Sequence, residues 1–205
     1  MKKTTMLLAA LVVCSVRAAF GQGLLTFDAD LSGPAESPPN ASPGTGFAQA
    51  IFDDNTQTLQ IEVQFSGLLG TTTASHIHAA TTSPGAGTAG VATTTPYFVG
   101  FPLGVTSGSY SNTLDLTASS SYNSSYITAH GGTTAGAETA LISAMESGTA
   151  YLNIHTTVVP GGEIRGFFTQ VPEPGTVSLV MVGALVLAWR TRRERPNTER
   201  ATASN

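Results

Sequence analysis

The clearest pattern along the chain is a strict alternation of apolar and polar residues in TLQIEVQF, residues 58–65. Its apolar side chains, from Leu59 to Phe65, fall on one face of an extended chain, as in a half-buried β-strand. The stretch GFAQAIFD just before it is also strand-like, and DDNTQ at residues 53–57 supplies turn residues. We therefore predict a β-hairpin over residues 47–65.

Further strand-like stretches recur along the chain, separated by segments rich in glycine, proline and serine. They are LLTFDADL (24–31), SHIHA (75–79), SYSNTLDL (109–116), AYLNIHT (150–156) and GEIRGFFTQ (162–170). One helix is expected over residues 138–147, ended by Gly148. Short strands at this spacing predict an all-β domain, an antiparallel β-sandwich with Greek-key connections and one short helix.

The N-terminus has a different pattern, a short apolar run between charged and small residues. Two lysines precede MLLAALVV at residues 6–13, and small residues follow near Ala18 and Gly21. These are the parts of a secretory signal peptide, and the run is too short to span a bilayer. We predict that residues 1–21 form a signal helix that is removed on export. The single cysteine, Cys14, lies inside it, so the mature chain would have no disulfide.

The C-terminal segment carries a second apolar run. Pro172, Glu173 and Pro174 precede the apolar residues 177–189, and four arginines follow. A helix over residues 175–189 would be about 22 Å long. The hydrocarbon core of a bilayer is about 30 Å thick, so this would be a short transmembrane helix. The arginines would keep its end on the cytoplasmic side.

This order of Pro-Glu-Pro, short apolar run and arginine cluster resembles a PEP-CTERM sorting signal. The resemblance implies a bacterial exosortase that cuts near the Pro-Glu-Pro motif, and a membrane-anchored intermediate that then reaches the cell surface or the outside. The alternative is an ordinary single-span membrane anchor. We assign residues 171–196 to the sorting signal with its short transmembrane helix, and residues 197–205 to a cytoplasmic tail.

Residues 22–170, between these ends, are enough for one domain. They carry ten carboxylates against the single guanidinium of Arg165, a net charge of −9. A domain with one cation cannot neutralise phosphates, which excludes nucleic acid as a partner. The same charge excludes an anionic membrane surface, keeps the domain soluble and favours multivalent cations as weak partners.

Five short motifs occur in order in this domain: FDADLSGPAESPP, VQFSGL, ASHIHAA, YLNIHT and GGEIRG. Together they resemble the CHRD domain, a chordin-type module of secreted proteins, over residues 25–170. The resemblance implies an all-β extracellular module and carries no known reaction. It favours an exported, non-enzymatic surface or extracellular-matrix protein. An extracellular polysaccharide or a surface protein would be its partner outside the cell.

Polar side chains capable of chemistry recur on the late strands. Asn153 and His155 share one face of YLNIHT, and Glu163 and Arg165 share one face of GEIRG. The turn sequence PGG at residues 160–162 predicts that these two strands form a hairpin. If the apolar residues between them face the core, the four polar residues lie together on the opposite face.

His76 and His78, two positions apart in SHIH, also share a face of their strand. One interpretation is structural: the histidines join Asn153, Glu163 and Arg165 in a hydrogen-bonded network, with no cofactor. This is the leading prediction, because buried polar groups are usually satisfied internally.

A second interpretation is a Cu or Zn site made by His76, His78 and His155, since two imidazoles at i and i+2 and a third from another strand suit these metals. The HIH strand resembles the copper-binding strand of Cu/Zn superoxide dismutase, although no bridging histidine or disulfide pair is recognisable. The alternative function is therefore a metal-binding, superoxide-dismutase-like β-sandwich. A third interpretation, a histidine acting as general base, lacks any accompanying catalytic motif, so we expect no enzyme.

Overall fold

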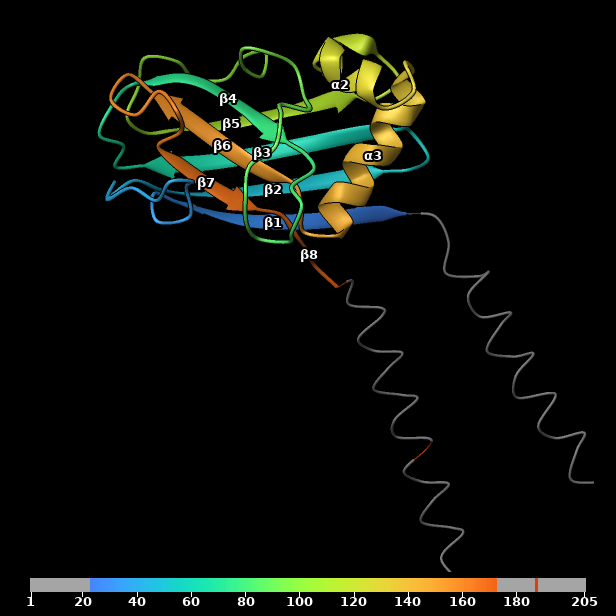
Figure 1. The fold of residues 1–205 in the computed structure, drawn as a ribbon, viewed down its shortest axis with the longest axis horizontal. Coiled ribbons are helices and arrows are strands. Elements are labelled where there is room, and N and C mark those ends of the chain that lie inside the picture. The colour runs from blue at the N-terminus through green and yellow to red at the C-terminus, as the bar shows by residue number, and fades with distance from the viewer. Residues whose placement is uncertain (1–22, 173–186, 188–205) are drawn as a thin grey trace, which may run out of the picture. The chain divides into compact units, whose positions relative to one another are not determined.

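The alternating stretches form antiparallel strands of one sheet. The computed structural model describes residues 23–172 and Leu187, and within them eight strands pair in the order β4-β6-β7-β1-β2-β3-β5, with β8 beside β1 (Figure 1). The strands are β1 (Leu24–Ser32), β2 (Thr45–Asp53), β3 (Thr58–Ser66), β4 (Thr72–His78), β5 (Gly108–Asp115), β6 (Tyr151–Thr156), β7 (Ile164–Phe167) and β8 (Thr169–Gln170). The predicted all-β, antiparallel fold is confirmed.

The sheet curls so that its two halves form two layers. In Figure 1, β4, β6 and β7 cross in front of β1, β2, β3 and β5. The halves are joined where β7 meets β1, at the register pair of Ser32 and Arg165. A Cβ atom on Gly166 would lie 2.3 Å from the carbonyl oxygen of Asp30, so this junction requires a residue without a side chain. The expected sandwich is therefore one continuous sheet folded on itself.

The hydrophobic core lies between the two layers. The alternation in β3 buries its apolar residues, with Leu59 and Ile61 fully buried, in the same cluster as Ile77 of β4 and Ile154 of β6. Each strand therefore presents one apolar face inward. The opposite face of β4, β6 and β7 is left for polar residues, and the candidate site lies there.

Two α-helices occur in the described part of the chain, α2 (Ser124–Ala129) and α3 (Thr134–Glu146), after a 3₁₀ turn, η1 (Ser119–Ser121). The expected helix at residues 138–147 is α3, and it ends before Gly148 as predicted. It starts at residue 134 because the Thr133 side chain accepts a hydrogen bond from the backbone N–H of Gly136, which caps the helix there. Helix α2 was not expected, since six residues are too few to show a helical period.

Both predicted hairpins are present. β2 pairs with β3 around the turn at residues 54–57, and β6 pairs with β7. β4 lies on the other side of β6, so its SHIH sequence is placed beside YLNIHT. Loops cover the outer face of β4, β6 and β7. Side chains on this face donate hydrogen bonds to loop carbonyl groups: Arg165 to those of Ala35 and Gly87, and His76 to that of Pro96.

The predictions for the two chain ends concern residues that the structure does not describe. Residues 1–22, 173–186 and 188–205 lie outside the described residues, so the signal helix, Glu173, Pro174 and the predicted transmembrane helix (apart from Leu187) are not described. Pro172 is exposed. Among the described residues, no helix has the length and hydropathy needed to cross a membrane.

Candidate functional site

Three histidines from two adjacent strands converge on the outer face of β4 and β6. Nε2 of His76 lies 3.0 Å from Nε2 of His155, and the rings of His76 and His78 have centroids 4.7 Å apart. One ring nitrogen from each histidine lies within 4.8 Å of the other two. The structure therefore brings together all three histidines that the sequence singled out.

The other nitrogen of each ring is held by the backbone. A carbonyl oxygen lies 2.8–3.1 Å from each Nδ1 atom, that of Pro96 for His76, Ala89 for His78 and Pro160 for His155. A carbonyl only accepts, so each Nδ1 donates, and in a neutral imidazole Nε2 then carries the lone pair. Backbone contacts from two loops, the β4–β5 connection and the β6–β7 turn, thus fix the tautomer that a metal ligand needs.

Burial keeps these rings neutral. Burial, together with charge repulsion from the neighbouring His78 and His155, lowers the pKa of His76 to about 4. Burial is also the main cause that lowers the pKa of His78 to about 4, and it lowers the pKa of His155. At neutral pH no proton separates the His76 and His155 Nε2 atoms, so their lone pairs face each other at 3.0 Å. Nε2 of His78 is buried without a hydrogen-bond partner.

This donor set fits a transition-metal ion. Zinc and copper bind imidazole nitrogen at about 2.0–2.1 Å, which separates tetrahedral ligand nitrogens by roughly 3.3 Å. The Nε2 atoms of His76 and His155 are 3.0 Å apart, close to that value, and a ligand nitrogen of each of the three histidines lies within 4.8 Å of the others, so the rings would have to move closer together to bind an ion. A bound cation would also satisfy the facing lone pairs and the unpartnered Nε2 of His78.

A carboxylate that the sequence analysis did not single out lies beside this cluster. Glu36, in the loop after β1, accepts a hydrogen bond of 2.8 Å from Nδ2 of Asn153 and lies 3.8 Å from Nε of Arg165. Burial raises the pKa of Glu36 to about 7, against the opposing effect of the Arg165 charge. The sequence signal that could have found it is its motif, GPAESPP, where it is the one charged residue.

Arg165 links this group to the histidines through an aromatic ring. Its guanidinium carbon lies 4.7 Å from the ring centroid of Tyr151, and the Tyr151 ring stacks on His78 with centroids 4.7 Å apart. Asn153 is opposite both His76 and Arg165 in the strand register. Asn153 and Arg165 thus lie together, as predicted from the strand pattern.

Glu163 lies apart from Arg165, although both were expected on one face. It precedes β7, is fully buried, and binds the loop after β3. Its oxygens accept hydrogen bonds from the Ser42 and Thr156 hydroxyls at 2.6 and 2.5 Å, and from the N–H groups of Leu69 and Gly70 at 2.5 and 3.1 Å. Glu163 therefore anchors loops at one end of the sheet.

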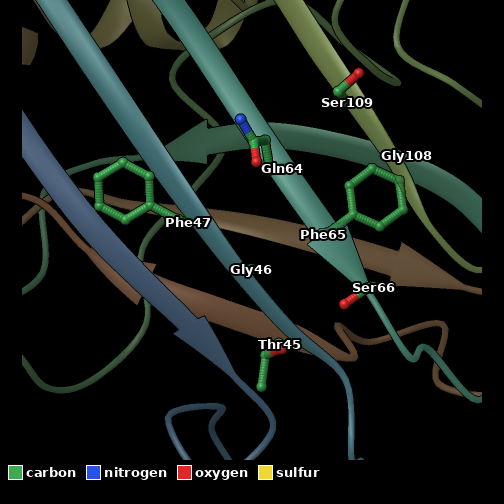
Figure 2. Close-up of a pocket in the computed structure, with 8 residues that line it drawn as sticks. All are labelled: Thr45, Gly46, Phe47, Gln64, Phe65, Ser66, Gly108 and Ser109. Carbon is green, nitrogen blue, oxygen red and sulfur yellow. The ribbon is translucent and has the colours of Figure 1, made fainter.

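A shallow groove on the outer face of β2, β3 and β5 is a second candidate feature (Figure 2). It encloses about 700 Å³ and is lined by Thr45, Gly46, Phe47, Gln64, Phe65, Ser66, Gly108 and Ser109. Phe47 is 42% exposed and lies opposite Gln64, which in turn is opposite Ser109. The groove thus offers one exposed aromatic ring among neutral hydrogen-bonding groups.

The fold is an antiparallel two-layer β domain with loops over a polar site. It places the chain in the class of all-β modules. Within that class it belongs to the CHRD domain family, whose profile matches residues 27–168. Residues 170–193 match the PEP-CTERM protein-sorting motif. No curated protein and no solved structure matches the chain.

The resemblances to the CHRD domain and to the PEP-CTERM sorting signal are therefore confirmed. The sorting motif indicates an exported protein with a membrane-anchored sorting stage, and it implies processing by an exosortase.

Proposed function

We propose that this protein is an exported, non-enzymatic surface or extracellular-matrix module that binds one transition-metal ion through His76, His78 and His155. The observation that carries the metal assignment is the gathering of three imidazoles with ligand nitrogens within 4.8 Å of one another, each ring oriented by an Nδ1 hydrogen bond to a backbone carbonyl.

A purely structural network accounts less well for this geometry. It explains the Asn153–Glu36 bond, in which both partners are satisfied. It leaves the Nε2 of His78 unpartnered and two lone pairs facing each other, which costs free energy in a buried site. The domain charge of −9 adds a favourable long-range potential for a cation.

The proposal is for a single ion rather than a two-metal dismutase centre. Within residues 23–172, one group of metal-ligating side chains gathers closely enough to hold an ion, and it is the three histidines. A dismutase-like centre would need a bridging histidine and a second set of ligands. This supports a binding site without the paired-metal chemistry of that enzyme.

Elemental analysis of the purified full-length chain tests the metal site. We expect about one Cu or Zn per chain, and none after the double substitution His76→Ala/His78→Ala. The matched control is His130→Ala, because Nδ1 of His130 contacts the Tyr126 carbonyl at the end of α2, outside the cluster. A folded wild-type chain that retains no metal, or equal loss in the control, would refute the proposal.

The surface or matrix role is supported by the sorting motif and by the groove beside Phe47. We propose an uncharged extracellular polysaccharide as the occupant of this groove. Sugar rings stack on exposed aromatic side chains, and amide and hydroxyl groups bind their hydroxyls. The acidic residues Asp28, Asp30 and Glu62 on the same sheet would repel an acidic polymer.

Two measurements test this role. Mass spectrometry of the protein from its native host should find a mature chain that ends near residues 172–174, without the arginine tail; an intact tail would indicate a simple anchor. Affinity electrophoresis in gels containing a neutral glucan should show retardation that Phe47→Ala abolishes. Val158→Ala, at an exposed residue in the β6–β7 loop, is the matched control.

A further inference from the structure

The charge around the three histidines can distinguish between metal ions. The ligands are three neutral imidazoles, and within the described residues no carboxylate or thiolate belongs to the set. A bound ion would therefore keep its full charge. This differs from sites in which Asp, Glu or Cys ligands neutralise a dication.

The cluster lies in a setting that disfavours added positive charge. His76 is 7% exposed, and Tyr151 and Arg165 are 3% and 4% exposed, whereas His78 and His155 are partly exposed, so water screens the site only in part. The guanidinium of Arg165 stacks on the Tyr151 ring, which itself stacks on His78. The guanidinium of Arg165 is thus a fixed positive charge separated from the ligand His78 only by the Tyr151 ring.

The nearest carboxylate does not offset this charge for the metal. Glu36 is 6% exposed and lies 3.8 Å from Nε of Arg165, and its other oxygen accepts the Asn153 amide. In its ionised form, Glu36 therefore balances Arg165 rather than the metal ion. A dication would leave the site with two uncompensated charges, and a monocation with one.

The cost of burying an ion rises with the square of its charge, so a dication loses roughly four times the hydration free energy of a monocation of the same size. Copper(I) is the transition-metal monocation that binds imidazole and accepts three ligands. Zinc prefers four, and here the fourth would have to be water. The number of ligands and the charge of the site thus both favour copper(I).

Resting on the metal site proposed above, we infer that the three-histidine cluster is selective for copper(I) over zinc(II). The selectivity arises from the neutral ligand set, from burial, and from the fixed cation at Arg165.

Anaerobic competition on the full-length chain tests this inference. The metal-free protein is titrated with Zn(II), and separately with Cu(I) kept reduced by ascorbate, each against a chelator of known affinity. We expect Cu(I) to bind at least 100-fold more tightly than Zn(II), and one equivalent of Cu(I) to displace bound Zn(II). The X-ray absorption edge of the copper should show a three-coordinate Cu(I) site with nitrogen ligands.

Two variants separate the charge argument from simple ligand preference. Arg165→Gln removes the fixed cation, so the ratio of Cu(I) to Zn(II) affinity should fall at least tenfold. Glu36→Gln removes the counter-charge, so the ratio should rise. His130→Ala should leave it unchanged. If a variant does not fold, as judged by circular dichroism, the wild-type competition decides alone.

The outcomes are distinguishable. Zn(II) bound as tightly as Cu(I) by the wild-type chain would overturn the selectivity and leave the metal site standing. No binding of either ion would overturn both. Equal shifts in the same direction for Arg165→Gln and Glu36→Gln would refute the electrostatic cause.

Discussion

Glu163 shows at the scale of one residue how a buried charge holds loops in place. Its carboxylate is fully buried and accepts four hydrogen bonds, two from hydroxyls and two from backbone N–H groups. We predict that Glu163→Gln lowers the free energy of unfolding by about 2–4 kcal/mol, because an amide nitrogen cannot accept the bonds that one carboxylate oxygen accepts. Urea denaturation measures this. Glu62→Gln, at an exposed position of β3, should change stability by less than about 0.5 kcal/mol.

The same carboxylate should govern stability in acid. Burial alone would raise the pKa of Glu163, but hydrogen bonds from Ser42, Thr156, Leu69 and Gly70 together hold it below its ordinary value of 4.5. The unfolded chain therefore takes up this proton first, and the stabilisation is lost as pH falls below 4.5. The Glu163→Gln variant should therefore lack this loss of stability below pH 4.5. If its stability falls with pH as in the wild-type chain, Glu163 does not cause the loss.

His76 and His78 should act in a higher pH window. Burial lowers the pKa of both rings from 6.5 to about 4. Between pH 6.5 and pH 4, these histidines are therefore protonated in the unfolded chain but not in the folded chain. We predict that the metal-free protein loses stability as pH falls from 6.5 towards 4. Thermal melts across this range measure the loss, and His76→Gln/His78→Gln should flatten it. Retention of the full slope in that variant would refute the prediction.

The strand period predicted correctly that His76 and His78 share a face, was wrong for Glu163 and Arg165 because β7 begins only at Ile164, and did not show what surrounds these residues. His76 and His78 are two positions apart, and alternation alone puts them on one side. Glu36 was missed because it reaches Asn153 across 117 residues from a loop, where no period operates. The Nδ1 contacts with Pro96, Ala89 and Pro160 also come from loops. The lone-pair convergence that supports a metal site was therefore not readable from the sequence.

The turn between β6 and β7 gives a test at the scale of an element. Gly162 has a φ of +127°, and a Cβ atom there would lie 2.3 Å from Nδ2 of Asn153 and 2.7 Å from Oε1 of Glu36. We predict that Gly162→Ala breaks the Asn153–Glu36 bond and lowers the free energy of unfolding by about 2 kcal/mol or more.

The adjacent Gly161 supplies a matched control. A Cβ atom on Gly161 has nothing within 4 Å, so Gly161→Ala should be nearly neutral. Thermal melts of the two variants measure the difference. Similar melting temperatures would show that the turn can shift without disturbing Glu36.

Local elements were predictable where the pairing partner is near in sequence. The β2–β3 and β6–β7 hairpins followed from turn residues between alternating strands. The pairing of β4 with β6, which sets His76 opposite Asn153, was not predictable because more than 70 residues separate these strands. The same holds for β1 with β7, where the close approach at Gly166 shapes the curl of the sheet.

At the scale of the whole domain, the dominant electrostatic feature is the imbalance of charge. Ten carboxylates between residues 22 and 170 face one guanidinium, and that guanidinium is buried beside Glu36. Self-repulsion among exposed carboxylates destabilises a compact state, and salt screens it over about 10 Å at 0.1 M. We predict that the melting temperature of the domain rises by a few degrees between about 10 and 300 mM NaCl. Circular dichroism of the metal-free chain, with a chelator present, measures this.

The exposed carboxylates, rather than a general effect of salt, should cause that rise. Asp30 and Glu62 are exposed on β1 and β3, on the polar sheet face that also carries Phe47. The double substitution Asp30→Asn/Glu62→Gln should raise the melting temperature at low salt and reduce its dependence on salt. A melting temperature that falls with salt would instead show that attractive pairs, such as Arg165 with Glu36, outweigh repulsion. The acidic surface would then have to be explained by its partners, with cations from the medium as the first to test.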